Sequence, residues 1–161
     1  MDKTNETNAE NINKIIIHFK KQGYEDEWIK LYLLKKYKND DLISEAIQRL
    51  HQVEFRKHII DRDNKCLISG YDPMECEAAH IVPYSICKNY DTTNGLLFNM
   101  CLHKLFDEYI FSINPVTNKI VIKKRITNLS ICQYNNKIIN IPHECKTNLN
   151  IHYRIFLEKN N

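Results

Sequence analysis

The sequence predicts an α+β fold in which a helical N-terminal part precedes a mixed part of short strands and helices. Two observations support this prediction. Apolar residues recur at helical spacing through residues 12–63, which is typical of amphipathic helices. After Asn64 the apolar runs become short, and Gly, Pro, Asn and Asp separate them, which is typical of strands and turns.

The N-terminal part is expected to contain three helices. Residues 12–22 place isoleucines and a phenylalanine on one face, and residues 25–38 begin with acids and end with lysines, which suits the helix dipole. Either Asp40 or Asp41 is suited to cap a third, longer helix. Residues 1–11 are polar and are expected to form a disordered tail.

Beyond Asn64 the pattern predicts two hairpins, one further strand and two helices. In the first hairpin, the run at 65–69 is expected to pair with residues 75–82 across the turn at 70–73. Residues 100–109 carry apolar residues at helical spacing. The other expected elements are a hairpin at 109–126, a strand at 136–141 and a last helix at 148–159.

Composition and charge exclude several classes of protein. No apolar run among the 161 residues approaches the roughly 20 residues that span a bilayer, so no membrane partner is expected. The N-terminus lacks a signal pattern, which predicts an intracellular and not a secreted protein, in the cytoplasm or in the nucleus of a eukaryotic or viral host. The six cysteines are then expected as reduced thiols. A net charge of +3 permits a polyanionic partner without requiring one.

Four polar residues in the middle of the chain form a candidate catalytic constellation. His103 and Asp107 are four apart on an expected helix, so an imidazole and a carboxylate share one face and can bind one divalent cation. His80 ends an apolar run and, with an ordinary pKa of about 6.5, is suited to act as a general base near pH 7. Asn94 can fix a loop or the ring of His80 by hydrogen bonding.

This combination of residues suits the hydrolysis of a phosphodiester. A cation neutralises charge on the phosphate, and a neutral histidine takes a proton from the attacking water. Each residue also has a plainer interpretation when it is taken alone. His80 is then a buried structural histidine, Asn94 is a turn residue, and His103 and Asp107 are an exposed helical pair.

Four segments in order along the chain resemble the HNH endonuclease family, whose fold is the ββα-metal finger. The segments are CLISG at 66–70, ECEAAHIVPYS at 75–85, NGLLF at 94–98 and HKLFD at 103–107. They are most similar to the subgroup with an Ala-Ala-His-Ile motif, which is found often in restriction-type nucleases. The resemblance starts near Phe55 and continues past the finger to residues 140–157.

The composition of the N-terminal part and the resemblance of the rest together predict a division of the chain into three parts. A tail at 1–11 and a helical region at 12–53 precede an HNH nuclease domain at 54–161. That domain is expected to combine a ββα-metal core with a flanking β-hairpin and a C-terminal helix. The function implied is a metal-dependent endonuclease that hydrolyses DNA phosphodiester bonds.

The resemblance also implies a role for each candidate residue. His80 is the general base, Asn94 holds the loop and supports the base, and His103 and Asp107 hold one divalent metal ion. Many relatives carry a further ligand directly before the base, where this chain has Ala79. Glu77 is the nearest acid and the third candidate ligand, although strand alternation predicts that it faces away from the base.

The expected cofactor is Mg²⁺, with Mn²⁺ or Zn²⁺ as alternatives. Carboxylate ligands and a site completed by water and phosphate suit Mg²⁺. Many relatives bind a structural zinc ion through two CxxC pairs. The cysteines of this chain do not occur at that spacing, so no zinc knuckle is expected.

The expected partner is DNA, in double-stranded form. Arg56, Arg62, Lys88 and Lys104 are candidates for contacts with the phosphates, which would be salt-dependent and independent of sequence. The N-terminal helices are a candidate surface for a protein partner or a homodimer. Two alternatives to the nuclease stay open: a non-catalytic nucleic-acid-binding module that keeps the finger as a scaffold, and an interaction protein that recruits another factor through its N-terminal helices.

Overall fold

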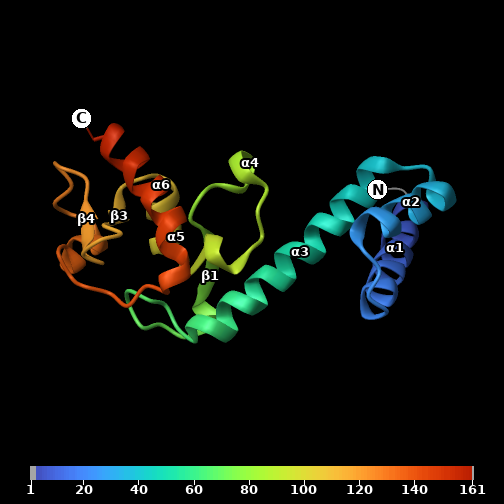
Figure 1. Cartoon of the computed structure of the whole chain (residues 1–161), viewed down its shortest axis with the longest axis horizontal. Helices are drawn as coiled ribbons and strands as arrows, with labels where there is room; N and C mark the ends of the chain where they lie inside the picture. The colour runs from blue at the N-terminus through green and yellow to red at the C-terminus, as the bar shows by residue number, and fades with distance from the viewer. Residues whose placement is uncertain (1–2, 161) are drawn as a thin grey trace. The chain divides into compact units, whose positions relative to one another are not determined.

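The structure is a computed structural model that describes residues 3–160 (Figure 1). The chain divides into two compact units, Met1–Glu54 and Phe55–Asn161. This division lies within one residue of the boundary expected between residues 53 and 54. No helix in the described part of the chain is long and apolar enough to cross a membrane.

The first unit contains three helices. They are α1 (Lys3–Lys21), α2 (Asp26–Tyr37) and the first part of α3 (Asp40–Asp63). Their apolar faces form one core, whose buried members are Ile12, Ile16, Ile29, Leu33, Ile43 and Ala46. The side chain of Asn39 accepts a hydrogen bond from the Leu42 amide at 3.1 Å. Asn39 therefore caps α3 in place of the expected Asp40 or Asp41.

The structure differs from the sequence prediction at residues 3–11, which are helical and not disordered. Residues 1–2 of the predicted tail lie outside the described residues. Adding residues to an existing helix is far more favourable than starting one, and no Gly or Pro interrupts this segment. The helix that the buried isoleucines stabilise therefore continues towards the N-terminus through polar residues.

The second unit contains a β-β-α arrangement. Strand β1 (Cys76–His80) pairs antiparallel with β2 (Gly95–Asn99), and His80 lies opposite Gly95. The connection carries a short helix α4 (Tyr84–Cys87) and a 3₁₀ turn η2 (Thr92–Asn94). Helix α5 (Met100–Asp107) follows β2 directly and packs against both strands. The side chain of Asn99 caps α5 by accepting a hydrogen bond from the Leu102 amide at 2.9 Å.

The expected hairpin between residues 65–69 and 75–82 does not form, because β1 pairs with β2. Residues Cys66–Ser69 instead make a turn in which the Gly70 amide donates to the Cys66 carbonyl at 2.9 Å. Gly70 has a φ of +75°, in the region that favours glycine. Cys66 and Ile68 of this run are buried in the core of the unit, and the partly buried Leu67 packs against that core. Periodicity alone does not distinguish such a buried turn from a strand.

The C-terminal part of the second unit adds a small second sheet and a helix. Strands β3 (Phe111–Ile113) and β4 (Ile120–Ile122) form the expected hairpin. Residues 136–141 make only a single bridge, between Ile138 and Lys119. Helix α6 (Lys146–Glu158) packs against β3 (Figure 1). The remaining elements are the 3₁₀ turns η1 (Pro73–Glu75), η3 (Ser130–Tyr134) and η4 (His143–Cys145).

One core connects the two small sheets with α5 and α6. Its largest fully buried side chains include Phe98, Phe106 and Phe111, whose rings pack edge-on or tilted with centroids 5.2–6.1 Å apart. This mixture of helices with two two-stranded sheets is compatible with the expected α+β fold. The candidate site residues His80, Asn94 and His103 lie on or next to β1, β2 and α5.

Candidate active site

His80 stands at the end of β1 in an aromatic surrounding. Its ring stacks on Phe55, with centroids 4.4 Å apart and an interplanar angle of 15°. Tyr84 and Tyr90 lie at 5.9 and 5.7 Å from the same ring. These rings restrict the orientation of the imidazole, because buried side chains pack closely in single rotamers.

Gly95, opposite His80 in the sheet, leaves room for Phe55. A Cβ atom at position 95 would lie 2.5 Å from Cζ of Phe55 and 2.6 Å from Cδ1 of Ile59. Both distances are well below ordinary carbon–carbon contact, which is about 3.5–4.0 Å. The glycine is therefore needed so that the ring of Phe55 can lie against the imidazole.

The imidazole of His80 is partly buried and favours the neutral form. Burial lowers the pKa of His80 below its ordinary value, and the neighbouring positive charge of His103 lowers it further, whereas Asp107 acts in the opposite direction. Nε2 of His80 is shielded from solvent and makes no hydrogen bond to any residue among 3–160. A neutral imidazole keeps a lone pair on one of its two nitrogens, and that nitrogen has the chemistry of a base.

Asn94 is fully buried and connects the two ends of the loop between the strands. Its Oδ1 accepts from the Val82 amide at 2.9 Å, and its Nδ2 donates to the Val82 carbonyl at 3.0 Å. Val82 is two residues beyond His80. Asn94 thus holds the loop and fixes the chain next to the proposed base. Its side chain bonds to Val82, Cys87 and Asn89 of this loop and not to the ring of His80.

His103 lies between two carboxylates. Its Nδ1 is 2.6 Å from Oε2 of Glu77, and its Nε2 is 3.2 Å from Oδ2 of Asp107. About a fifth of the His103 side chain is exposed, whereas about half of each carboxylate side chain is exposed. Glu77 reaches His103 because α5 packs across the strand that carries Glu77. The structure thus brings together all three candidate ligands.

The two carboxylates favour a protonated His103. Burial alone lowers the pKa of His103, but the hydrogen bonds and negative charges of Asp107 and Glu77 outweigh burial, so the net pKa is raised above its ordinary value. With a proton on each nitrogen, the ring donates to both acids. A divalent cation would take the place of one of these protons, because a ligand nitrogen must be unprotonated.

The donor set of His103, Glu77 and Asp107 fits a divalent cation, but not with all three groups around one point. The two carboxylates meet different nitrogens of the same ring. One cation therefore takes His103 with one of the acids, unless the ring turns. In agreement with this geometry, no cluster of three acidic, histidine or cysteine side chains poised around a single metal occurs among residues 3–160.

The four basic residues proposed for DNA contacts divide into two pairs. Arg56 donates to the Cys76 carbonyl at 2.6 Å, and Arg62 donates to the carbonyls of Thr92 and Gly95 at 2.7 Å each. These bonds hold β1 and β2 in place, so both arginines have an internal structural role. Lys88, after α4, and Lys104, beside His103, are exposed on the surface.

Arg62 and Asp63 form an ion pair that the sequence did not predict. Nε of Arg62 lies 2.7 Å from Asp63, whose Oδ2 in turn accepts from the Leu97 amide at 2.9 Å. The pair fastens the end of α3 to β2. An adjacent arginine and aspartate are ordinary on a helix surface, so the sequence alone gave no signal of this role.

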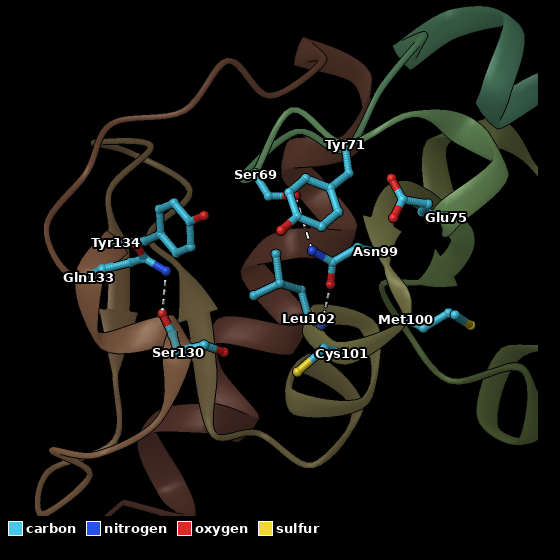
Figure 2. Close-up of a pocket in the computed structure, with 10 residues that line it drawn as sticks. All are labelled: Ser69, Tyr71, Glu75, Asn99, Met100, Cys101, Leu102, Ser130, Gln133 and Tyr134. Atoms are coloured by element: carbon cyan, nitrogen blue, oxygen red, sulfur yellow. Dashed lines mark hydrogen bonds between the residues drawn. The ribbon is translucent and has the colours of Figure 1, made fainter.

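A cavity of about 300 Å³ lies beside the start of α5 (Figure 2). Figure 2 shows Asn99 in the wall of this cavity, where its Nδ2 donates to the Ser69 hydroxyl at 3.0 Å while its Oδ1 caps α5. None of the proposed site residues is among the residues that line the cavity. Its relevance to the site is that Asn99 fixes the N-terminal end of the helix that carries His103.

Comparison with known families agrees with this geometry. A family model described as HNH endonuclease matches residues 66–114, the segment that holds β1, β2 and α5 with the proposed base and metal ligands, whereas Arg56 and Arg62 lie outside it. The match supports the HNH family for this part of the chain and suggests a nuclease-type function. That family typically uses a divalent metal and implies a nucleic-acid substrate. No curated protein matches the chain significantly.

Proposed function

We propose that the second unit is a metal-dependent HNH endonuclease that hydrolyses phosphodiester bonds of double-stranded DNA. The observation that carries the proposal is the pairing of two unlike histidines on one ββα unit. His80 favours the neutral form and has an unbonded nitrogen, whereas His103 is flanked by two acids. A base beside a cation-binding group is the arrangement that metal-assisted hydrolysis requires.

In this proposal His80 takes the proton from the attacking water. The imidazole is neutral at pH 7 because its pKa is lowered by burial. Nε2 is shielded from bulk solvent, so the water that it activates arrives with the substrate. Phe55 and Asn94 keep the ring and the adjoining loop in position.

His103 would hold the cation with Asp107 on Nε2 or with Glu77 on Nδ1. The ion, for which Mg²⁺ is the proposed identity and Mn²⁺ or Zn²⁺ the alternatives, supplies charge neutralisation at the scissile phosphate. The remaining carboxylate keeps its hydrogen bond to the other ring nitrogen, and this bond fixes the tautomer of His103.

Lys88 and Lys104 are proposed to contact the phosphates. Both are exposed, and neither takes part in an ion pair that competes for its charge among those found for residues 3–160. Arg56 and Arg62 support the same surface from within through their bonds to backbone carbonyls. Each exposed contact would make binding more dependent on salt.

The test is nicking of supercoiled plasmid by wild-type protein and by His80→Ala, with Mg²⁺ or Mn²⁺ and with EDTA as the control. We expect EDTA to abolish nicking, and His80→Ala to lower the rate by about 10²–10⁴-fold, the contribution of a positioned base. Mn²⁺ binding by the variant should stay within about twofold of wild type, since His80 is not a ligand. Unchanged nicking by His80→Ala would refute the role of His80.

One observation favours a second candidate, a non-catalytic nucleic-acid-binding module. Both nitrogens of His103 contact carboxylates, and Nε2 of His80 is shielded from solvent. In this arrangement none of these three nitrogens is open to a metal ion or a water molecule. Tight DNA binding without any metal-dependent nicking by pure protein would select this candidate. Nicking that increases with added metal and disappears in His80→Ala would exclude it.

The first unit is proposed to contact a protein partner or a second copy of the chain. Tyr24, Trp28 and Tyr32 are each about 40% exposed, and the last two rings are stacked with an interplanar angle of 10°. Exposed aromatic residues are frequent at interfaces. Sedimentation of the full chain, compared with Trp28→Ala, tests for the homodimer, which the variant should weaken.

A further inference from the structure

The C-terminal end of α5 is held by a buried histidine from α6. His152 is 2% exposed, and its Nε2 lies 3.1 Å from the Phe106 carbonyl oxygen. Its Nδ1 lies 2.8 Å from the hydroxyl of Ser112 in β3. The ring is also stacked between Phe106, at 3.7 Å and 5°, and Tyr109, at 4.6 Å and 19°. One side chain therefore connects α6, α5 and β3.

The partners of His152 determine its protonation. A carbonyl oxygen can only accept, so Nε2 carries the hydrogen and donates to Phe106. Nδ1 then has a lone pair and accepts from the Ser112 hydroxyl. Because both nitrogens are used inside the core, His152 is available neither as a base nor as a ligand. Its effect on the site has to pass through the residues it contacts.

Those contacts lie next to the proposed ligands. Phe106 directly precedes Asp107, and its carbonyl accepts two hydrogen bonds at the end of α5, one from the Tyr109 amide at 3.0 Å and one from Nε2 of His152 at 3.1 Å. The chain then turns sharply at Tyr109, which has a φ of +54°. The same tyrosine ring packs on His152.

Helix α5 depends on such external supports because it is short. It has 8 residues, and helices of this length are not stable by themselves in water. Asn99 fixes the N-terminal end through its hydrogen bonds to the Leu102 amide and the Ser69 hydroxyl. His152 fixes the other end. His103 lies between the two supports and Asp107 directly follows the second, so the relative orientation of these two side chains depends on both ends of the helix.

We propose that His152 is a positioning residue for the cation site, which it acts on through the Phe106 carbonyl by holding the last turn of α5. The inference rests on the proposed function, because it concerns the residues proposed to hold the metal. Groups that orient metal ligands from behind typically change metal affinity by 10–100-fold. His152 is expected to act in this range although it touches neither the ligands' donor atoms nor the substrate.

The test compares three variants of the full chain with wild type. His152→Ala removes both hydrogen bonds, and His152→Gln keeps an amide donor that can reach the Phe106 carbonyl. Leu149→Ala is the matched control, because Leu149 is fully buried on the same helix, one turn earlier, and its loss lowers stability without removing that bond. Mn²⁺ binding is measured by calorimetry at a temperature where circular dichroism shows each variant folded.

We expect His152→Ala to weaken Mn²⁺ binding at least tenfold, His152→Gln to recover most of the loss, and Leu149→Ala to stay within about twofold of wild type. Wild-type affinity in His152→Ala would overturn the proposal, and so would an equal loss in Leu149→Ala. If His152→Ala does not fold, Ser112→Ala removes one of the two bonds and should give a smaller loss in the same direction. Wild-type affinity in Ser112→Ala would then overturn the proposal.

A second measurement separates this inference from the proposed function. Without metal, the ¹⁵N chemical shifts of the His103 ring report its hydrogen bonds to Glu77 and Asp107. If His152→Ala changes these shifts while Leu149→Ala does not, His152 positions α5, even if wild-type protein neither binds Mn²⁺ nor cuts DNA. Unchanged shifts in His152→Ala would overturn the positioning role directly, whatever the activity.

Discussion

Adding one methyl group at Gly95 should displace the proposed base. A Cβ atom in Gly95→Ala would lie 2.5 Å from Cζ and 2.8 Å from Cε2 of Phe55, and 2.6 Å from Cδ1 of Ile59. Reaching a carbon–carbon contact of about 3.5 Å requires the Phe55 ring to move by about 1 Å. Phe55 is 3% exposed, so the surrounding core resists this movement.

The movement has two expected consequences. Overpacking of a dense core lowers the free energy of unfolding by about 1–3 kcal/mol. The imidazole of His80, which stacks on Phe55 at 4.4 Å, moves with the ring. A misplacement of about 1 Å can lower a rate by about 10²-fold. We therefore expect Gly95→Ala to reduce both thermal stability and nicking, with Mn²⁺ binding much less affected.

The assay combines urea unfolding with plasmid nicking in a double-mutant cycle. Phe55→Leu removes the two ring atoms that the new methyl group meets and leaves its contact with Cδ1 at the end of the Ile59 side chain. If crowding is the cause, Gly95→Ala should destabilise the Phe55→Leu protein by much less than it destabilises wild type. Equal destabilisation in both backgrounds, or no loss of nicking by Gly95→Ala, would refute the reasoning.

Two further predictions concern pH. The rate of nicking should fall as pH decreases, because His80 must be unprotonated to act as the base. The midpoint of the kcat/KM profile should lie below pH 6.5, since burial and then the charge of His103 lower the pKa of His80. A midpoint above pH 6.5 would contradict the assignment of His80 as the base. The second prediction concerns stability. Burial lowers the pKa of His152 to about 4; the hydrogen bond to the Phe106 carbonyl and the charge of Asp107 raise this pKa, whereas the charge of Lys159 lowers it. Between pH 6.5 and 4 the unfolded chain therefore takes up the proton first. The free energy of unfolding falls with decreasing pH by up to about 3 kcal/mol, from 2.5 pKa units at about 1.36 kcal/mol each. Urea unfolding at pH 7.5 and pH 4.5 should show a smaller fall in His152→Gln, and an equal fall in the two proteins would count against this explanation.

The helices and the second hairpin could be predicted from the sequence because their signals are local. The apolar spacing of residues 12–22 and 25–38 predicts helices that the structure contains. A turn flanked by apolar runs predicts the β3–β4 hairpin in the same way. At these positions the preference of the chain and the demands of packing agree.

The partner of β1 could not be predicted because pairing is not local. The run at 65–69 is apolar and close in sequence, but β1 pairs with β2, about 20 residues further along the chain. The contact of Glu77 with His103 could not be predicted from the sequence either. Strand alternation places it away from His80, and only the packing of α5 across the sheet brings His103 to within 2.6 Å of it. Residues joined by tertiary packing leave no signature in spacing.

The side-chain amide of Asn94 determines which part of the loop between β1 and β2 is free to vary in sequence. By exchanging two hydrogen bonds with Val82, this side chain behaves like a neighbouring strand and closes the loop at its base. Beyond that closure, Ser85, Ile86 and Lys88 project into solvent. Substitutions at these exposed positions can therefore change the outer surface of the loop while the backbone next to His80 keeps its place.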